Sequence, residues 1–277
     1  MQVIHSVSEL RQRLSTENSV AFVPTMGNLH EGHLDLVRIA KSKSTCVVVS
    51  IFVNRLQFDP NGDFDRYPRT LQQDCKQLEQ AGVNIVFAPD EKEMYPVAQE
   101  VIVQPPSIAD TLEGEHRPGH FAGMATVVIK LLNIVQSNVA VFGKKDYQQL
   151  AIVRQLVDQL NLPIEIIGAE TIRAEDGLAL SSRNGYLSVE ERKEAIRLNE
   201  QLRWIVKSIK DGEHDYKKLE DIAMSVLNKH HWKVDYIAIR QQYGLTEPNA
   251  SSNKLVVLGA ASLGKTRLID NIEVDIL

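Results

Sequence analysis

The feature that most constrains the fold is an alternation through the first two thirds of the chain. Apolar runs rich in Val and Ile alternate with amphipathic stretches whose apolar residues recur every three or four positions. This pattern is typical of β-α-β units, in which helices connect the strands of a parallel sheet. We expect strands at residues 20–24, 45–53, 84–88, 101–104, 139–142 and 164–167, and helices at residues 34–43, 70–81, 124–135 and 147–160. The sequence therefore predicts an α/β protein: a Rossmann-like parallel sheet with helices on both faces.

The pattern changes near Ser188. Two charged helical segments are followed by three alternating runs, at residues 189–210, 216–230, 234–240, 254–258 and 266–274. This order predicts a smaller α+β domain. The turn dipeptide Asp176-Gly177 marks a boundary. We expect a Rossmann-like ligand-binding domain over residues 1–177 and a smaller C-terminal domain over residues 178–277 that closes over the site.

Charge and hydropathy exclude several classes of protein. The chain of 277 residues carries 31 Lys and Arg against 36 Asp and Glu, a net charge of −5. This net charge provides no overall electrostatic attraction for nucleic acid or anionic lipid. Its longest apolar stretch, Cys46 to Val53, is far shorter than the ~20 residues of a membrane span. The N-terminus lacks the apolar block of a secretory signal, so we expect a cytoplasmic protein. Cys46 and Cys75 have no metal-binding or redox spacing and are expected to be buried free thiols.

The segment Pro24-Thr25-Met26-Gly27-Asn28-Leu29-His30-Glu31-Gly32-His33 leaves the first predicted strand and enters a helix, where α/β folds bind ligands. His30 and His33 flank Gly32 at that helix N-terminus, which already favours an anion. Each imidazole offers an N–H donor, and Gly32 lets a phosphate approach the backbone. The alternatives are ordinary loop histidines or half of a zinc site, although the i, i+3 spacing differs from the i, i+4 pair of HExxH.

A second motif, Gly259 to Thr266, satisfies the GxxxxGK[ST] pattern of a P-loop. A P-loop must open a helix and be followed by a distant magnesium-binding Asp. Here the residues after Thr266 alternate as a strand, and the eleven residues that follow Thr266 are too few for a helix and a distant Asp. We therefore interpret this match as a turn between strands.

Three further segments place polar side chains at strand ends or in loops. Phe142 to Leu150 follows a strand, so Lys145 can meet a phosphate, and Asp146 can accept from a ribose hydroxyl or cap the next helix. In the loop Asp176 to Gly185, hydroxyls and a guanidinium can close over phosphates, or the loop can be a solvated turn. Amides at positions 54 and 57 can bind a small acid.

Several residues remain less defined by the pattern. Asp74 is either an outer Mg²⁺ ligand or a solvated carboxylate, in a helix that a capping box of Thr70 and Gln73 would open. Ser188 and Glu191 predict a second capping box. Arg117 and His120 lie in a Pro- and Gly-broken segment and could line the same pocket.

Taken together, PTMGNLHEGH, FVNRLQF, YPRT, HRPGHFAG, FGKKDYQQL, LALSSRN and the terminal GKTRLIDN resemble the pantothenate synthetase family, the pantoate:β-alanine ligases. The resemblance spans nearly the whole chain in order, and HxGH also belongs to the wider nucleotidyltransferase superfamily. It implies an ATP- and Mg²⁺-dependent, usually dimeric enzyme that condenses pantoate with β-alanine through a pantoyl adenylate, releasing pyrophosphate and AMP. One departure is Arg55, where the family commonly has Pro.

The resemblance also implies roles for individual residues. His30, His33, Lys145 and Arg183 would be catalytic. The ATP site would include Met26, His33, Gly143, Lys145, Asp146, Ser181, Ser182 and Arg183. Gln57 and Gln149 would bind pantoate, and Asp74 and Gln77 would lie near the metal. Another adenylyltransferase or an ATP sensor without turnover are the alternatives, and pyrophosphate release would separate the sensor from an enzyme.

Overall fold

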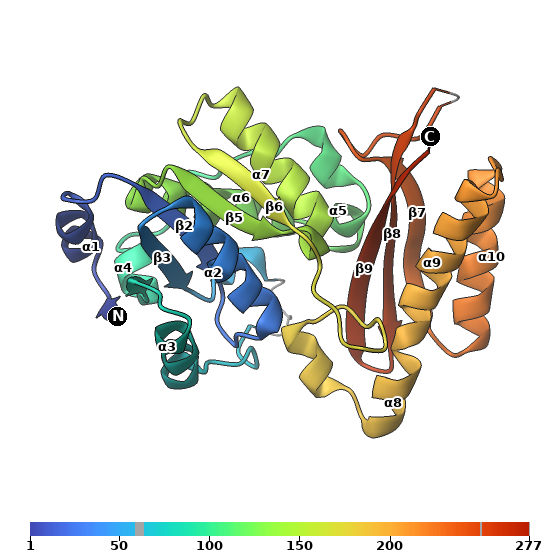
Figure 1. Cartoon of the computed structure of the whole chain (residues 1–277), viewed down its shortest axis with the longest axis horizontal. Coiled ribbons are helices and arrows are strands. Elements are labelled where there is room, and N and C mark those ends of the chain that lie inside the picture. The colour runs from blue at the N-terminus through green and yellow to red at the C-terminus, as the bar shows by residue number, and fades with distance from the viewer. Residues whose placement is uncertain (59–63, 250, 277) are drawn as a thin grey trace.

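The computed structural model describes residues 1–58, 64–249 and 251–276 and contains two sheets, each with its own helices (Figure 1). Six parallel strands form the larger sheet in the order β1-β4-β3-β2-β5-β6. Their bounds are β1 Gln2–Ile4, β2 Val20–Thr25, β3 Cys46–Ile51, β4 Ile85–Phe87, β5 Val139–Gly143 and β6 Glu165–Ala169. The predicted α/β architecture is confirmed.

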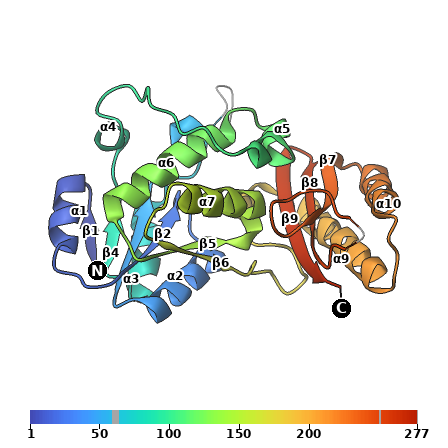
Figure 2. The same cartoon turned by 90° about the horizontal axis from the view of Figure 1, so that it is seen from above.

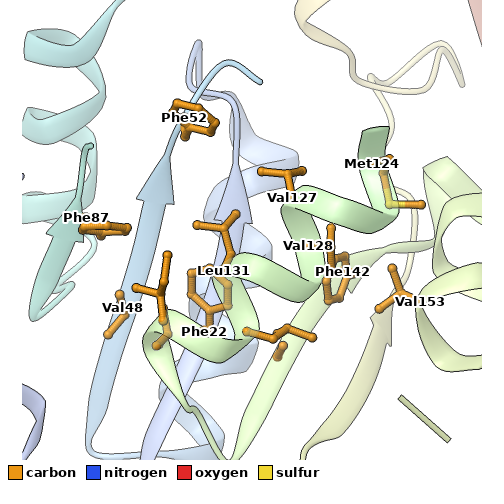
Figure 3. Close-up of a cluster of buried hydrophobic side chains, with 14 of the residues drawn as sticks. Phe22, Val48, Phe52, Phe87, Met124, Val127, Val128, Leu131, Phe142 and Val153 are labelled. Atoms are coloured by element: carbon orange, nitrogen blue, oxygen red, sulfur yellow. The ribbon is translucent and has the colours of Figure 1, made fainter. Parts of the chain in front are cut away.

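Helices cover both faces of this sheet, as Figure 2 shows from above. They are α1 Val7–Leu14, α2 Glu31–Lys43, α3 Leu71–Gln80, α4 Glu91–Met94, α5 Glu113–His116, α6 His120–Val135 and α7 Tyr147–Gln159. Side chains of β2 alternate between the faces: Phe22 packs under α6 and α7, whereas Val23 packs against α2. Figure 3 shows the first of these clusters, with Val127 and Leu131 of α6 lying over the strands.

The smaller sheet is antiparallel, in the order β7-β8-β9. Its strands and helices are α8 Val189–Glu194, α9 Ile196–Lys210, α10 Tyr216–Lys229, β7 Lys233–Gln241, β8 Lys254–Leu263 and β9 Thr266–Asp275. The helices α9 and α10 pack on one face of this sheet, and the other face lies toward α7 (Figures 1 and 2). The predicted smaller α+β part is confirmed.

Charged and neutral hydrogen bonds join the part built on the larger sheet to the part built on the smaller sheet. Glu113 accepts two hydrogen bonds of 2.7 Å from Arg267 of β9 and one of 2.9 Å from the Tyr236 hydroxyl of β7. Asn271 donates from Nδ2 to the carbonyls of Lys144 and Lys145, at 2.9 Å each. The second sheet therefore supports the segment that follows β5.

Four details differ from the sequence-based expectations. Residues 101–104 form no strand, and the short edge strand β1 was not expected. The predicted helix 189–210 is divided at Ala195 into α8 and α9. The Thr70 capping box is wrong, because the Thr70 hydroxyl donates to Asp74 Oδ2 at 3.0 Å and makes no cap hydrogen bond. The Ser188–Glu191 capping box is confirmed.

Two other interpretations are confirmed by the structure. The GxxxxGK[ST] match is a turn, since β8 ends at Leu263 and β9 begins at Thr266, with Gly264 at a φ of +58° between them. Both cysteines are free thiols as expected, and Cys46 is buried, but Cys75 is only half-buried, so its expected burial is not observed. Within the described ranges, no helix has the length and apolar character that a membrane span needs.

Candidate active site

The site begins where β2 ends, beside the point at which the strand order reverses between β2 and β5. Gly27 there has a φ of +80° and Asn28 a φ of +52°, so the chain turns sharply before α2. The buried Asp74 carboxylate of α3 holds this turn. It accepts from the backbone N–H groups of Asn28 at 3.0 Å and Leu29 at 2.9 Å.

His30 and His33 are fixed by the first turn of α2. The Nδ1 atom of His30 accepts from the Gly32 backbone N–H at 3.1 Å, and Nδ1 of His33 accepts from the His30 N–H at 3.3 Å. Since Nδ1 accepts in both neutral rings, the proton of each is on Nε2. The rings lie 4.1 Å apart between centroids. Gly32 is needed here, because a Cβ would approach His30 Cε1 to 2.9 Å.

Both imidazoles are neutral near pH 7. Burial, with a smaller contribution from the nearby Lys145 cation, lowers the pKa of His30 to about 4. Burial likewise lowers the pKa of His33 to about 3, with contributions from His30 and Lys145. The pair therefore offers hydrogen-bond donors to an anion without adding charge before the anion arrives.

The end of β5 supplies a second group of polar residues. Gly143 ends the strand, and a single 3-10 turn, Lys144–Asp146, leads into α7. The Lys145 and Asp146 side chains line the same cavity as the imidazoles, and so does Gln149, one turn into α7. Asp146 precedes α7 but its side chain makes no cap hydrogen bond, so of its two expected roles helix capping is not observed.

The loop before α8 supplies a third group. The Ser182 hydroxyl donates to the Asn28 carbonyl at 3.1 Å, which joins this loop directly to the turn after β2. Ser181 caps the 3-10 turn Ser182–Tyr186 by accepting from the Arg183 N–H at 3.2 Å. Sequence positions more than 150 residues apart thereby share one wall of the site.

Amides of the segment after β3 form another part of the site, the amide end. The buried Asn54 donates from Nδ2 to Gln57 Oε1 at 3.1 Å and to the Gly123 carbonyl at 3.2 Å. The Gln57 carbonyl accepts from His120 Nδ1 at 2.8 Å, and Arg117 donates to His120 Nε2 at 3.0 Å. Burial and the Arg117 charge lower the pKa of His120 to about 4, so this ring is also neutral.

The two imidazoles, the polar residues after β5, the loop before α8 and the amides of Asn54 and Gln57 surround one cavity of about 220 Å³. It collects the residues that the sequence predicted for nucleotide and acid, which are Met26, His30, His33, Gln57, Gly143, Lys145, Asp146, Gln149, Ser181, Ser182 and Arg183. Arg117 and His120 line a smaller adjoining cavity of about 30 Å³ that shares Lys145, Asp146 and Gln149. The structure thus places the predicted residues together, while their individual roles stay predictions.

The two residues predicted near the metal, Asp74 and Gln77, do not line this cavity. Asp74 has 1% of its surface exposed, and its two oxygens accept from two backbone amides and the Thr70 hydroxyl. Gln77 keeps a buried Oε1 without a partner among the described residues. Neither lines the cavity, and no cluster of three or more His, Cys, Asp or Glu in the described ranges could hold a metal. This donor set does not fit Mg²⁺, which takes several accessible oxygen ligands.

Sequence reasoning missed some of the lining. Thr171 and Ile172 follow β6, and their position after a strand was a usable signal. Tyr67, quoted only within the YPRT motif, also lines the cavity. Local sequence gave no sign of this, because Tyr67 reaches the site through tertiary packing.

The geometry defines a class: an α/β enzyme that binds an anion beside a small polar molecule at the switch point of its sheet. A family model described as Pantoate-beta-alanine ligase matches residues 2–273. The chain is 59% identical over 274 residues to the pantothenate synthetase of Nitrosospira multiformis, covering 99% of this chain and 98% of that protein. It is 58% identical over 275 residues to that of Neisseria meningitidis, covering 99% of both.

Solved structures agree. The pantothenate synthetase of Thermus thermophilus superposes with a TM-score of 0.94 at 42% identity, over 98% of this chain and 99% of that one. The Francisella tularensis pantoate-beta-alanine ligase, complexed with beta-gamma ATP and beta-alanine, superposes with a TM-score of 0.82 at 37% identity, over 98% of this chain and 97% of that one. The chain belongs to the pantoate-beta-alanine ligase family. The predicted reaction, ATP-dependent joining of pantoate and β-alanine through an adenylate, is confirmed.

Proposed function

We propose that the cavity carries out both steps of this ligation, with the triphosphate at the imidazole end and pantoate at the amide end. A pantoate carboxylate oxygen attacks the α-phosphorus of ATP, and the bond to the β-phosphate oxygen breaks, releasing pyrophosphate. The β-alanine nitrogen then attacks the acyl carbon, the bond to AMP breaks, and the amine loses its proton. No protein nucleophile is needed, so catalysis rests on positioning and charge stabilisation.

One observation carries this assignment: the Nε2–H donors of His30 and His33 line the same cavity as the Gln57 and Gln149 amides. Donors that meet developing phosphoryl charge stabilise the transition state. The Lys145 ammonium, Ser181, Ser182 and Arg183 add cationic and hydroxyl groups on the same wall. We assign His30, His33, Lys145 and Arg183 as catalytic, Gly143 and Asp146 to the nucleotide, and Met26 to packing against ATP or pantoate.

The test is ATP–pyrophosphate exchange with and without pantoate. We expect exchange only with pantoate, because the acid must accept the adenylyl group. His33→Ala should reduce exchange at least ~100-fold, the scale for removing one transition-state donor. Exchange without pantoate, or a His33→Ala variant as fast as the parent, would contradict the assignment. An ATP sensor would give no exchange at all.

We further propose that the reaction uses Mg²⁺ carried by the nucleotide. Mg²⁺ in such sites is bound largely by substrate phosphates and water, which agrees with the lack of fit at Asp74 and Gln77. We therefore assign neither residue as a direct ligand. Exchange measured with excess EDTA should fall to background and return with added Mg²⁺. We also place the enzyme in the cytoplasm, where ATP is available.

A homodimer is the proposed assembly. Val101 and Ile102, in the segment expected to be a strand, are 78% and 47% exposed, and Val97 nearby is 77% exposed. This apolar segment has strand-forming residues but no partner strand among the described residues, so a second copy can cover it. Light scattering after size exclusion should give about twice the 31.1 kDa chain mass for the parent. The variant Val101→Lys should shift it toward the monomer.

A further inference from the structure

Tyr95 lies outside the cavity lining yet contacts the amide end of the site. It follows α4, and its hydroxyl donates to Asn54 Oδ1 at 2.7 Å. Its ring lies 6.0 Å from that of Phe52 between centroids, and Lys130 Nζ lies 4.6 Å from the centre of the Tyr95 ring. Burial raises the pKa of Tyr95, so the hydroxyl stays protonated and remains a donor.

This hydroxyl helps to fix which way two amides face, together with the Leu56 N–H, which donates to the same Asn54 Oδ1 at 3.4 Å. Asn54 Oδ1 accepts from Tyr95, so Asn54 Nδ2 must donate on its other side, where it meets Gln57 Oε1 and the Gly123 carbonyl. A backbone carbonyl can only accept, which independently supports this orientation of Asn54. Because Gln57 Oε1 accepts from Asn54, the Gln57 group that can face the ligand is Nε2. This nitrogen lies 3.2 Å from Met26 Sδ on the cavity wall.

We propose that Tyr95 is a positioning residue for pantoate, acting through Asn54 to hold Gln57 with its N–H donors toward the cavity. The inference rests on the proposed binding of pantoate by Gln57. Without the hydroxyl, Asn54 Oδ1 keeps only the longer 3.4 Å bond from the Leu56 N–H, so the Asn54 amide is held less firmly and Gln57 can turn its side-chain amide over. A site meant to receive a carboxylate or hydroxyl oxygen then presents an oxygen in part of the population, which repels that ligand.

The first measurement is steady-state kinetics of Tyr95→Phe, which removes one oxygen and keeps the ring. We expect the KM for pantoate to rise about fivefold, the scale of one hydrogen bond. The KM for ATP and the kcat at saturating pantoate should change by less than about twofold, because the phosphate end is unaltered. A parent-like pantoate KM in Tyr95→Phe would overturn the proposal.

A double-mutant cycle with Gln57→Met tests whether Tyr95 acts through Gln57. Gln57→Met alone should raise the pantoate KM. In that background Tyr95→Phe should add less than about twofold, because the amide to be oriented is gone. If Gln57→Met leaves the pantoate KM unchanged, the assigned role of Gln57 fails. If Gln57→Met raises it but Tyr95→Phe does not, or the two effects multiply in full, the relay fails and the assignment of Gln57 stands.

Two controls separate positioning from stability. Tyr236→Phe removes another buried tyrosine hydroxyl, which lies at the smaller adjoining cavity and donates to Glu113 at 2.9 Å instead of to Asn54. Glu91→Gln removes the negative charge from the exposed contact between α4 and Arg55 while leaving Tyr95 in place. Both should keep the parental pantoate KM. Thermal unfolding of all variants shows whether each is folded at the assay temperature; a pantoate KM raised equally in Tyr236→Phe would overturn the proposal.

Discussion

The two ends of the cavity hold their hydrogen-bonding groups differently. At the amide end, Asn54 and the Gln57 side-chain oxygen are bonded within the protein, and His120 holds the Gln57 backbone. At the phosphate end, backbone amides occupy only the Nδ1 atoms of His30 and His33, and Lys145 makes no side-chain hydrogen bond within the described ranges. In the proposed assignment the small acid therefore meets a prearranged surface, whereas the triphosphate meets the Nε2–H groups of His30 and His33 and the Lys145 ammonium, for which the described residues provide no hydrogen-bond partner.

The largest expected effect comes from Gly123→Ala, which should damage the amide end alone. A Cβ there would lie 1.9 Å from the Leu56 carbonyl oxygen and 2.7 Å from the Gln57 backbone nitrogen, so the short helix η1, Arg55–Gln57, must move away from α6. We expect at least a tenfold rise in pantoate KM and a loss of about 1–3 kcal/mol in stability. Steady-state kinetics and thermal unfolding measure both; an equal rise in ATP KM would show that the two ends are coupled.

Asp74→Asn addresses the phosphate end. The new amide turns a donor toward one of the two backbone N–H groups that Asp74 now binds, leaving that group unsatisfied at a cost of about 1–3 kcal/mol. The turn before His30 should loosen, so the KM for ATP should rise about fivefold while that for pantoate changes by less than about twofold. An unchanged ATP KM would mean that Asp74 stabilises the fold without positioning the imidazoles.

Lowering the pH should reduce the stability of the fold through histidines at both ends of the cavity. The folded-state pKa of His33, about 3, and that of His120, about 4, lie below the ~6.5 of an unfolded histidine. The unfolded chain therefore binds more protons in this range. The stability from these groups is complete above pH ~6.5 and is lost as the pH falls toward 4, by about 1–2 kcal/mol per histidine between pH 6.5 and 5.

Thermal unfolding at pH 7.5 and 5.0 measures this loss. The variant His120→Asn should have a smaller difference in Tm between the two pH values than the parent, because one of the titrating groups is gone. A parental Tm that does not change over this range would show that these rings are accessible to protons in the folded state.

The smallest effect is expected at Arg55, where the family resemblance leads us to expect Pro. Its guanidinium pairs with Glu91 at 3.0 Å and lies 3.9 Å from the centre of the Phe64 ring, but both charged side chains are about half exposed. Such exposed pairs contribute about 0–1 kcal/mol. Arg55→Ala should lower Tm only slightly and change pantoate KM by less than about twofold. A larger change in pantoate KM would show that this surface residue also helps to position the amides.

Elements defined by their own sequence pattern were predictable, and elements defined by their neighbours were not. The Val-rich run of β3 and the amphipathic pattern of α7 lie where periodicity places them. Residues 101–104 show the limit: the same residue types form no strand, because no sheet edge among the described residues pairs with them. Three-residue β1 is too short to show a period.

The site divides in the same way. His30, His33, Lys145 and Gln57 follow strands, and the common edge of a parallel sheet brings them together. The function of Asp74 was not accessible from its helix, because its partners Asn28 and Leu29 lie more than 40 residues away. Tyr95 reaches Asn54 over a similar separation, so no motif could show their contact.

The placement of the imidazole protons limits which amino acids evolution can place at position 33. The side chain there must accept from a backbone N–H on one side and donate toward the cavity on the other. Lysine and arginine carry more positive charge but have no acceptor, and asparagine and glutamine lack a rigid ring with the two functions on separate edges. Histidine alone among the twenty combines these properties, so selection for stronger anion attraction cannot replace it.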